Sequence, residues 1–200
     1  NRDLGNCADD ETFFAHLSHI TRELLRVTIP GRIAALHVMQ LITTLAGHGV
    51  IGLRDFRGAV IRHFVEHDWV FHGETTINKN PQSAAVRTHA KGLLFVQLHK
   101  DSSWMRPALA DYLLLFRAPG ENPVSVKPDC NNEDWIQWAH PVWNDIRETN
   151  VLNVAVAREN EDERHVCPLQ LDTIERAVRL WSNKGDVVLD PFAGIGSTGV

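Results

Sequence analysis

The sequence has few cysteines and no long apolar run, and both absences exclude whole classes of protein. Its 200 residues contain three cysteines, Cys7, Cys130 and Cys167. Their odd number and wide spacing indicate neither a disulfide framework nor a CxxC zinc pair. Apolar stretches end well before the roughly 18 residues that a membrane span needs, and no basic segment leads into an apolar one at the start. The sequence therefore predicts a soluble, cytoplasmic protein that contacts no membrane.

The sequence also lacks a surplus of basic residues, which argues against a protein that coats nucleic acid. It has 20 Lys and Arg against 25 Asp and Glu, a formal net charge of −5, whereas phosphate contacts normally come from extra cations. The charge is uneven, however, because the stretch 87–106 is basic and the stretch 129–175 is strongly acidic. Any polyanion is therefore expected to contact the first stretch.

What the sequence does contain is an alternation of helix and strand patterns. Apolar residues recur at helical spacing in three segments, a fourth segment is rich in Ala and Leu, and the short apolar runs between them are typical of buried strands. The expected helices span 10–27, 56–65, 82–99 and 171–181, and the expected strands span 32–39, 69–77, 111–117 and 187–189. This order predicts an α/β fold, an open parallel sheet with helices on both faces, whose ligands bind at the carboxyl ends of the strands.

The chain changes character twice. Residues 1–118 carry regular αβ units, and 119–164 are rich in Pro, Asn and acids, so we expect an irregular excursion from the sheet. Order returns in 165–200, which hold a helix, a strand and a Gly-rich loop. The tryptophans of the excursion are predicted to pack together rather than to stack on bases; they are Trp135, Trp138 and Trp143.

The most informative residues follow the last expected strand. Gly194, Gly196 and Gly199 form a GxGxxG string, which lets the backbone approach a ligand closely. Asp190 stands before the first glycine, so a carboxylate occupies the strand tip. A carboxylate there suits an amino group, such as that of S-adenosylmethionine, and would repel a pyrophosphate. A dinucleotide fingerprint and a plain helix-capping turn are the other interpretations of this string.

The string DPFAGIGSTG resembles the cofactor motif of DNA N4-cytosine and N6-adenine methyltransferases. Its late position is similar to the permuted group, in which the catalytic motif comes first. The preceding HVCPLQLDTIERAVRLWS is similar to the family's other cofactor segment, with Leu169 in place of a Lys. The resemblance implies a Rossmann-like methyltransferase sheet, incomplete in this chain, and the cofactor S-adenosyl-L-methionine. The implied cofactor contacts are Asp190, Pro191, Phe192, Ala193, Gly194, Gly196, Ser197, Thr198, His165, Cys167 and Pro168.

The same resemblance implies methyl transfer to the exocyclic amino group of adenine (N6) or cytosine (N4) in double-stranded DNA, in a bacterium or a phage-infected cell. The family's catalytic tetrapeptide, of Asp-Pro-Pro-Tyr or Asp-Pro-Pro-Phe type, does not occur in the sequence and is expected shortly before Asn1. Both ends of the chain look cut, so we expect this fragment by itself to transfer little or no methyl.

A basic string, RTHAKGLL, resembles a family segment that follows a strand end, here Ile77-Asn78-Lys79. Phosphate contacts are predicted for this stretch, although a solvated helix face also explains its charges. The predicted DNA contacts are Arg87, Lys91, Lys100, Ser102 and Arg106.

Two other functions are alternatives to methyl transfer. His63, Glu66 and His67 match the HxxEH spacing of inverted zinc peptidases, with both His on one helical face, but eleven His in the chain make chance spacings common. A non-catalytic DNA-binding relative of the methyltransferases is the other rival, because the catalytic tetrapeptide is not in the sequence.

Overall fold

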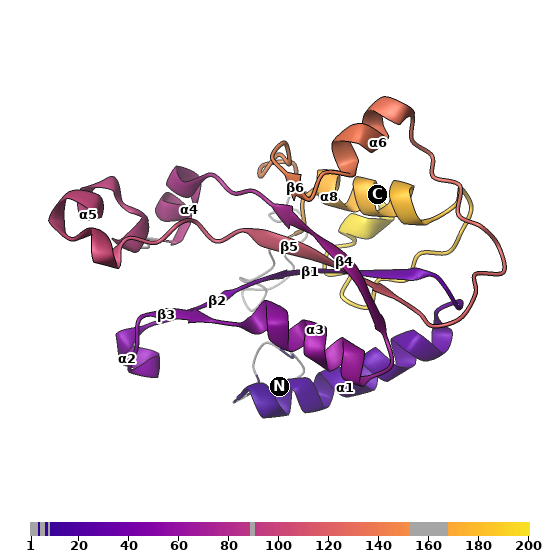
Figure 1. Ribbon diagram of the computed structural model, residues 1–200, viewed down its shortest axis with the longest axis horizontal. Coiled ribbons are helices and arrows are strands. Elements are labelled where there is room, and N and C mark those ends of the chain that lie inside the picture. Colours follow the sequence, from indigo (N-terminus) through magenta and orange to yellow (C-terminus); the bar gives the residue numbers. More distant parts are fainter. Residues whose placement is uncertain (1–3, 5–6, 8, 89–90, 153–167) are drawn as a thin grey trace.

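The computed structural model describes residues 4, 7, 9–88, 91–152 and 168–200 and contains one main sheet. Its strand order is β1-β5-β4-β6, with β1 at Ile33–Met39, β5 at Asp111–Arg117, β4 at Val70–Ile77 and β6 at Val142–Trp143. β5 runs antiparallel to both of its neighbours, and β6 runs parallel to β4. β1 and β4 therefore point in the same direction, with β5 between them (Figure 1).

The α/β class is confirmed, but the expected all-parallel arrangement of the strands is wrong. β5 begins and ends where the sequence predicts, and it is buried along most of its length. Burial on both faces, however, does not decide the direction of a strand. The direction follows from the connection 78–110, which returns the chain to the end of the sheet where β4 stops, so that Asp111 pairs with Ile77. β5 must then run back against β4.

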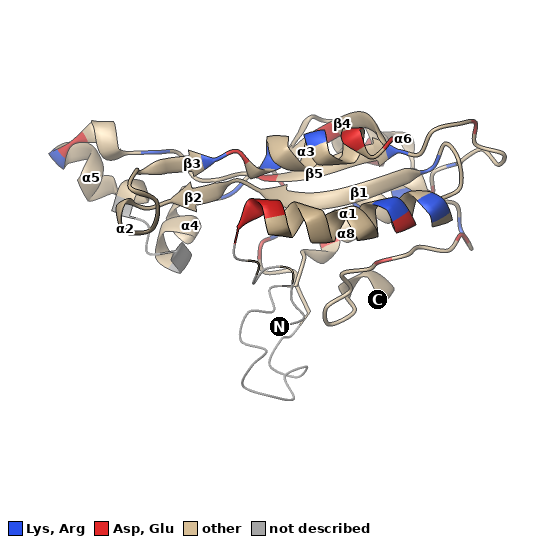
Figure 2. Ribbon diagram, turned by 90° about the horizontal axis from the view of Figure 1, so that it is seen from below, with Lys and Arg blue, Asp and Glu red and all other residues tan. Residues whose placement is uncertain are grey.

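One face of the sheet is covered by α1 (Asp10–Val27) and α3 (Phe56–Glu66). Asp9 caps α1 by accepting a hydrogen bond from the Thr12 backbone N–H at 2.7 Å. Acids lie in the first turn of α1 and Arg26 lies in its last turn, which matches the helix dipole (Figure 2). The buried core on this face consists of Leu17, Val60, Phe64, Trp69, Leu114, Phe116 and Ala118.

The opposite face of the sheet packs against α8 (Leu171–Trp181), with α6 (Asn132–Trp138) and β6 beside it (Figure 1). Successive strand side chains point to opposite sides, so Leu113 and Leu115 face α8 while Leu114 faces α1 and α3. Helices therefore cover both faces, as the sequence predicts. None of the described helices combines the length and the apolar character needed to cross a membrane.

The described part of the excursion 119–164 is mostly irregular, but it returns to the sheet through β6. The tryptophan packing cluster is confirmed for two of its three members. Trp143 is 1% exposed and donates its indole N–H to the Trp138 carbonyl at 2.9 Å, and Trp138 is also buried. Trp135 is 54% exposed and does not share this core.

Two segments extend beyond the sheet (Figure 1). The first is a hairpin made of β2 (Leu41–Thr43), α2 (Leu45–His48) and β3 (Gly52–Arg54). The second, which we name the 81–104 extension, contains α4 (Pro81–Thr88), η2 (Lys91–Leu93), α5 (Phe95–Lys100) and η3 (Ser102–Trp104).

The continuous helix expected over 82–99 is wrong, because the chain folds back on itself at Gly92. The Gly92 carbonyl accepts a hydrogen bond from the Arg106 backbone N–H at 3.1 Å. A Cβ atom at Gly92 would lie only 2.9 Å from the Trp104 carbonyl oxygen. This close approach requires glycine, and it divides the predicted helix into short pieces.

The strand expected at 187–189 is not formed in the described structure. Val187, Val188 and Leu189 are 96%, 48% and 60% exposed, and no described strand pairs with them. A strand obtains its backbone hydrogen bonds only from a neighbour. An apolar run of three residues therefore does not make a strand unless a partner lies beside it.

Candidate cofactor site

The Gly-rich loop closes on the carboxylate of Asp190. Its Oδ1 accepts a hydrogen bond from the Phe192 backbone N–H at 2.9 Å, and its Oδ2 accepts one from the Thr198 hydroxyl at 2.5 Å. Asp190 thereby joins the start of the loop to the short helix η5 (Ser197–Gly199). Each carboxylate oxygen has a second lone pair, so the group can also accept a hydrogen bond from a ligand.

Two glycines shape the backbone of this loop. Gly194 and Gly196 have φ angles of 55° and 85°, in the left-handed region that other residues rarely adopt. The Gly196 N–H donates to the Ala193 carbonyl at 2.8 Å, and nothing lies within 4 Å of the place where a Cβ at Gly196 would stand. The conformation requires glycine there, and the surrounding space leaves the backbone open to a ligand.

The loop rests on α8, where two buried polar atoms have no partner. η5 contacts α8, and Ser197 is 7% exposed. At the start of the helix, Oε1 of the N-cap residue Gln170 and Oγ1 of Thr173 are buried without a hydrogen bond to any described residue. Buried polar atoms are nearly always paired, so these two atoms suit a polar ligand. Pro168, a predicted contact, is partly buried just before Gln170.

The remaining predicted cofactor residues divide into two groups. Pro191, Phe192 and Ala193 form the exposed outer part of the loop. His165 and Cys167 lie outside the described residues.

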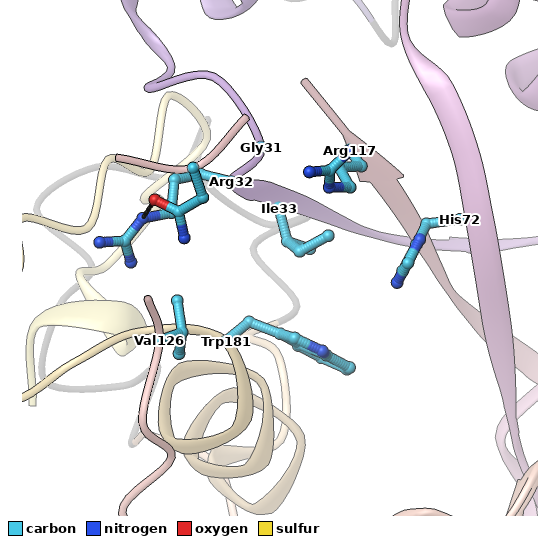
Figure 3. A pocket seen from close by; sticks show the side chains of 8 residues that line it. Gly31, Arg32, Ile33, His72, Arg117, Val126 and Trp181 are labelled. Atoms are coloured by element: carbon cyan, nitrogen blue, oxygen red, sulfur yellow. Dashed lines mark hydrogen bonds between the residues drawn. The ribbon is translucent and has the colours of Figure 1, made fainter. Parts of the chain in front are cut away.

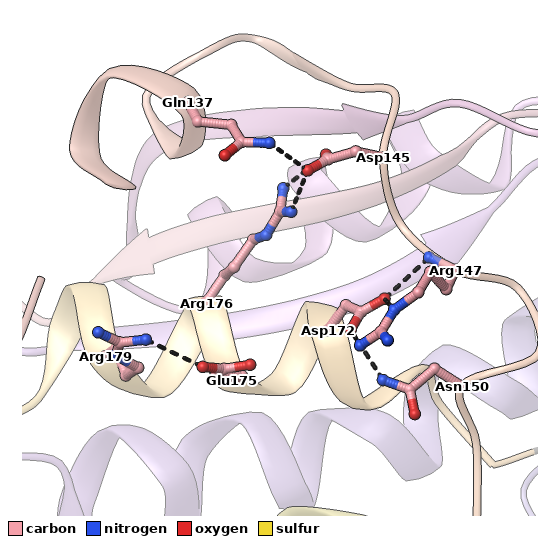
Figure 4. A network of polar contacts seen from close by, with 8 residues as sticks. All are labelled: Gln137, Asp145, Arg147, Asn150, Asp172, Glu175, Arg176 and Arg179. Atoms are coloured by element: carbon pink, nitrogen blue, oxygen red, sulfur yellow. Dashed lines mark hydrogen bonds and ion pairs between the residues drawn. The ribbon is translucent and has the colours of Figure 1, made fainter. Parts of the chain in front are cut away.

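Two ion pairs attach α8 to the segment that follows β6 (Figure 4). In the first turn, Asp172 accepts hydrogen bonds from the Arg147 guanidinium at 2.6 and 3.1 Å and from Asn150 Nδ2 at 2.8 Å. One helical turn further on, Arg176 donates to both carboxylate oxygens of Asp145 at 3.0 and 2.6 Å. These contacts hold the helix on which the loop rests.

The Asp172 pair makes stability depend on pH. The hydrogen bond from Arg147 lowers the pKa of Asp172 to about 2, whereas an unfolded Asp has a pKa of about 3.9. The pair therefore stabilises the fold above pH ~4, and its contribution disappears as the pH falls towards 2.

We expect Asp172→Asn to lower the free energy of unfolding by about 1 to 3 kcal/mol at pH 7. The difference from the wild type should shrink steadily between pH ~4 and pH ~2. Urea unfolding of both proteins at several pH values measures this, with Glu175→Gln on the exposed side of the same helix as control. A difference that stays constant down to pH 2 would contradict the role of the ion pair.

The predicted DNA contacts lie on the 81–104 extension and just after it. Lys100 and Ser102 are exposed at the turn between α5 and η3. Arg106 is partly buried and donates to the Pro107 carbonyl at 3.2 Å, and this burial lowers the pKa of its guanidinium. The side chains of Arg87 and Lys91 are outside the described part. Basic residues are spread over several elements rather than gathered on one (Figure 2).

The HxxEH residues have packing roles in the structure. His63 is buried, and its Nε2 forms a hydrogen bond with the Thr21 hydroxyl of α1 at 3.1 Å. His67 Nδ1 donates to the His63 carbonyl at 2.7 Å within α3. Burial lowers the pKa of His63. These bonds explain both His without a metal, and no three metal-ligating side chains converge among the residues described.

No sequence pattern indicated a polar cluster that lies at one end of the main sheet. His37 and Lys79 both contact the Asp111 carboxylate. The available signal was positional, because Lys79 follows the end of one expected strand and Asp111 begins another.

The fold and the loop together define an α/β protein with a Gly-rich loop, closed on the Asp190 carboxylate, after α8. The family model described as DNA methylase, N6_N4_Mtase, matches residues 2–200. The chain therefore belongs to this DNA methylase family.

Individual proteins resemble part of this chain in sequence and nearly all of it in fold. The chain is 31% identical over 90 residues to the type II methyltransferase M.BglI of Bacillus subtilis, a match that covers 45% of this chain and 23% of that protein. It is similar in structure to TTHA0409 of Thermus thermophilus, assigned as a DNA modification methylase and solved with S-adenosyl-L-methionine, with a TM-score of 0.69 and 22% identity over 99% of this chain and 70% of that one. A second structure of TTHA0409 matches with a TM-score of 0.66 and 22% identity over 98% and 68%. The match to M.BglI spans about a quarter of that relative's length.

Proposed function

We propose that the whole protein is an S-adenosylmethionine-dependent DNA methyltransferase that modifies adenine N6 or cytosine N4 in double-stranded DNA. The observation that carries the proposal is the loop 190–198, in a chain that belongs to the DNA methylase family. The loop contains the Asp190 carboxylate and two glycines with left-handed φ angles, and it contacts α8, whose start contains two buried polar atoms without a hydrogen bond to a described residue.

The donor and acceptor groups of this site fit S-adenosylmethionine. Asp190 can accept hydrogen bonds from an ammonium or a hydroxyl group, and Gln170 Oε1 is a buried acceptor. The exposed backbone of the loop allows the cofactor to approach closely. When bound, the cofactor supplies a methyl group on a sulfonium centre. The proposed contacts are Asp190, Pro191, Phe192, Ala193, Gly194, Gly196, Ser197, Thr198, His165, Cys167 and Pro168.

The residues of this loop would bind and orient rather than react. Asp190 holds the loop closed through Thr198, and α8 fixes the position of the loop relative to the sheet. Lys100, Ser102 and Arg106, with Arg87 and Lys91, are the proposed contacts to DNA phosphates, which position the duplex without reading its sequence.

The test is cofactor binding and methyl incorporation into DNA by the complete protein. We expect Asp190→Ala to weaken S-adenosylmethionine binding at least about tenfold, because it removes a charged hydrogen-bond acceptor from the loop. Isothermal titration calorimetry and transfer of a radiolabelled methyl group measure the two properties.

Asp129→Ala is the matched control, because this carboxylate is exposed and only the backbone carbonyl of Asp129, which the substitution keeps, contacts α8 through Arg179. It should leave cofactor affinity unchanged. A folded complete protein that binds DNA but neither binds the cofactor nor transfers methyl would overturn the proposal and favour a non-catalytic relative.

A further inference from the structure

His37, Lys79 and Asp111 form a polar cluster at one end of the main sheet. His37 lies near the end of β1, Lys79 follows the end of β4, and Asp111 begins β5 between them. Asp111 Oδ2 lies 2.9 Å from His37 Nε2 and 2.7 Å from Lys79 Nζ. The Lys79 and Asp111 side chains are only 5% and 9% exposed, whereas the His37 side chain is 27% exposed.

The Asp111 carboxylate is ionised although it is buried. Burial alone would raise the pKa of Asp111, but the hydrogen bonds from His37 and Lys79 lower it below its usual value. A buried ion pair of this kind adds little net stability, since its desolvation roughly offsets its attraction. Its presence at this position therefore suggests a role other than holding the fold together.

The hydrogen bond to Asp111 also determines which nitrogen of His37 carries the proton. An ionised carboxylate only accepts hydrogen bonds, so Nε2 must donate to Asp111. In the neutral ring Nδ1 is then an acceptor with a free lone pair. No described residue provides a hydrogen bond to Nδ1.

The His37 side chain is partly exposed on the face of the sheet that packs against α8. It is on the edge strand β1, on the same face as Leu113, its cross-strand partner. Its same-face neighbours Ala35 and Met39 are exposed. Since β1 and β4 run in the same direction, the cluster lies at their carboxyl ends, where open α/β sheets bind their ligands.

We propose that His37 is a catalytic residue whose Nδ1 accepts a hydrogen bond from the exocyclic amino group of the target base. Asp111 and Lys79 are positioning residues that fix its tautomer and orientation. The inference rests on the proposed function and extends it, because it names a group of this chain that contacts the methyl acceptor.

The chemistry of the acceptor explains why such a group is useful. The amino lone pair of adenine or cytosine is delocalised into the ring, and an acceptor on one N–H increases the electron density on nitrogen. When the N–C bond forms, the S–C bond breaks and its electron pair stays on sulfur. The nitrogen then carries one proton too many, and Nδ1 of His37 takes it. Asp111 stabilises the resulting imidazolium.

Two substitutions of His37 in the complete protein separate this role from a structural one. The Gln amide nitrogen of His37→Gln can occupy the place of Nε2 and keep the bond to Asp111, but it removes the acceptor at Nδ1. The Asn amide oxygen of His37→Asn can occupy the place of Nδ1, but the bond to Asp111 is lost. We expect kcat to fall about 100-fold in His37→Gln, with unchanged thermal stability and cofactor affinity. His37→Asn should be less stable yet keep more activity.

If His37 had only a structural role, His37→Gln would be more active than His37→Asn, because only Gln keeps the bond to Asp111. Wild-type kcat in His37→Gln would therefore overturn the inference.

Asp111→Asn supplies a readout besides activity. Its amide can donate to Nε2, which should move the His37 proton to Nδ1, and histidine ¹⁵N chemical shifts detect that change of tautomer. A resonance that keeps the Nε2–H tautomer in this variant would contradict the positioning role of Asp111.

The control is His19→Asn, an exposed histidine of α1 on the other face, which should leave kcat unchanged. Failure of the inference is distinguishable from failure of the proposed function. A wild-type protein that binds no cofactor and transfers no methyl overturns both, whereas an active wild type with an equally active His37→Gln overturns the inference alone.

Discussion

Replacing Asp145 with alanine is expected to lower the free energy of unfolding by about 2 to 3 kcal/mol, because it leaves the buried Arg176 guanidinium without its carboxylate. The loss stays below that of a fully buried pair because the Asp145 side chain is 41% exposed. The Arg176 side chain is 8% exposed and donates to both oxygens of Asp145. Its guanidinium also lies 5.0 Å from the centre of the Trp143 ring. Water can replace only part of the lost acceptors, because the guanidinium itself is packed against this ring. Urea unfolding followed by tryptophan fluorescence measures the loss.

Glu175 offers a matched control on the same helix (Figure 4). Its ion pair with Arg179 joins side chains that are 56% and 33% exposed, so Glu175→Ala should cost only about 0.5 kcal/mol. Replacing both partners, as Asp145→Leu with Arg176→Met, should recover much of the loss, because no unpaired buried charge is left. Equal losses in Asp145→Ala and Glu175→Ala would show that Arg176 is not effectively buried.

Replacing Phe116 with alanine is expected to cost about 3 to 5 kcal/mol, through lost burial and the cavity that remains. Phe116 is 0% exposed in β5. Its ring stacks on Phe64 with centroids 4.4 Å apart, and Phe71 lies against it at 5.7 Å. α1, α3 and the sheet meet at this residue, so the surrounding structure has little freedom to collapse into the space. Thermal and urea unfolding measure the effect.

Phe95→Ala is the corresponding surface control, because Phe95 is 74% exposed on α5 and should change stability by no more than about 0.5 kcal/mol. Phe116→Leu, which leaves a smaller void, should be intermediate. Phe116 lies on the face opposite α8, so the folded fraction of Phe116→Ala should bind cofactor as the wild type does. A loss below about 1 kcal/mol would contradict tight packing around Phe116.

The residues that line a small crevice beside the sheet have structural contacts, and we assign no function to the crevice. It has a volume of about 270 Å³ and lies between the start of β1, the end of β5 and the end of α8 (Figure 3). Arg117, on its wall, donates to the Gly120 carbonyl at 3.0 Å, and Arg32 pairs with Asp186 at 2.7 Å. These contacts hold the turns that surround α8 at the end of the sheet opposite His37.

The amino-acid sequence alone was enough to predict most of the secondary structure and to single out the Gly-rich loop. Strong local patterns identified β1, β4 and β5 and the helices α1, α3 and α8, because apolar periodicity reflects which side of an element is buried. The loop residues 190–199 are contiguous, so they could be proposed as a ligand-binding loop without knowing the fold.

The way these pieces combine depends instead on contacts between distant parts of the chain. The antiparallel direction of β5 depends on the path of the connection 78–110, and the break at Gly92 depends on a contact with Trp104. Residues 187–189 have a strand-like composition but no described neighbour to pair with. His37, Lys79 and Asp111 are separated by 74 positions at most, and no local pattern connects them. Strand pairing and ion pairs between residues distant in sequence depend on how the chain folds. These features could therefore be seen only in the three-dimensional structure.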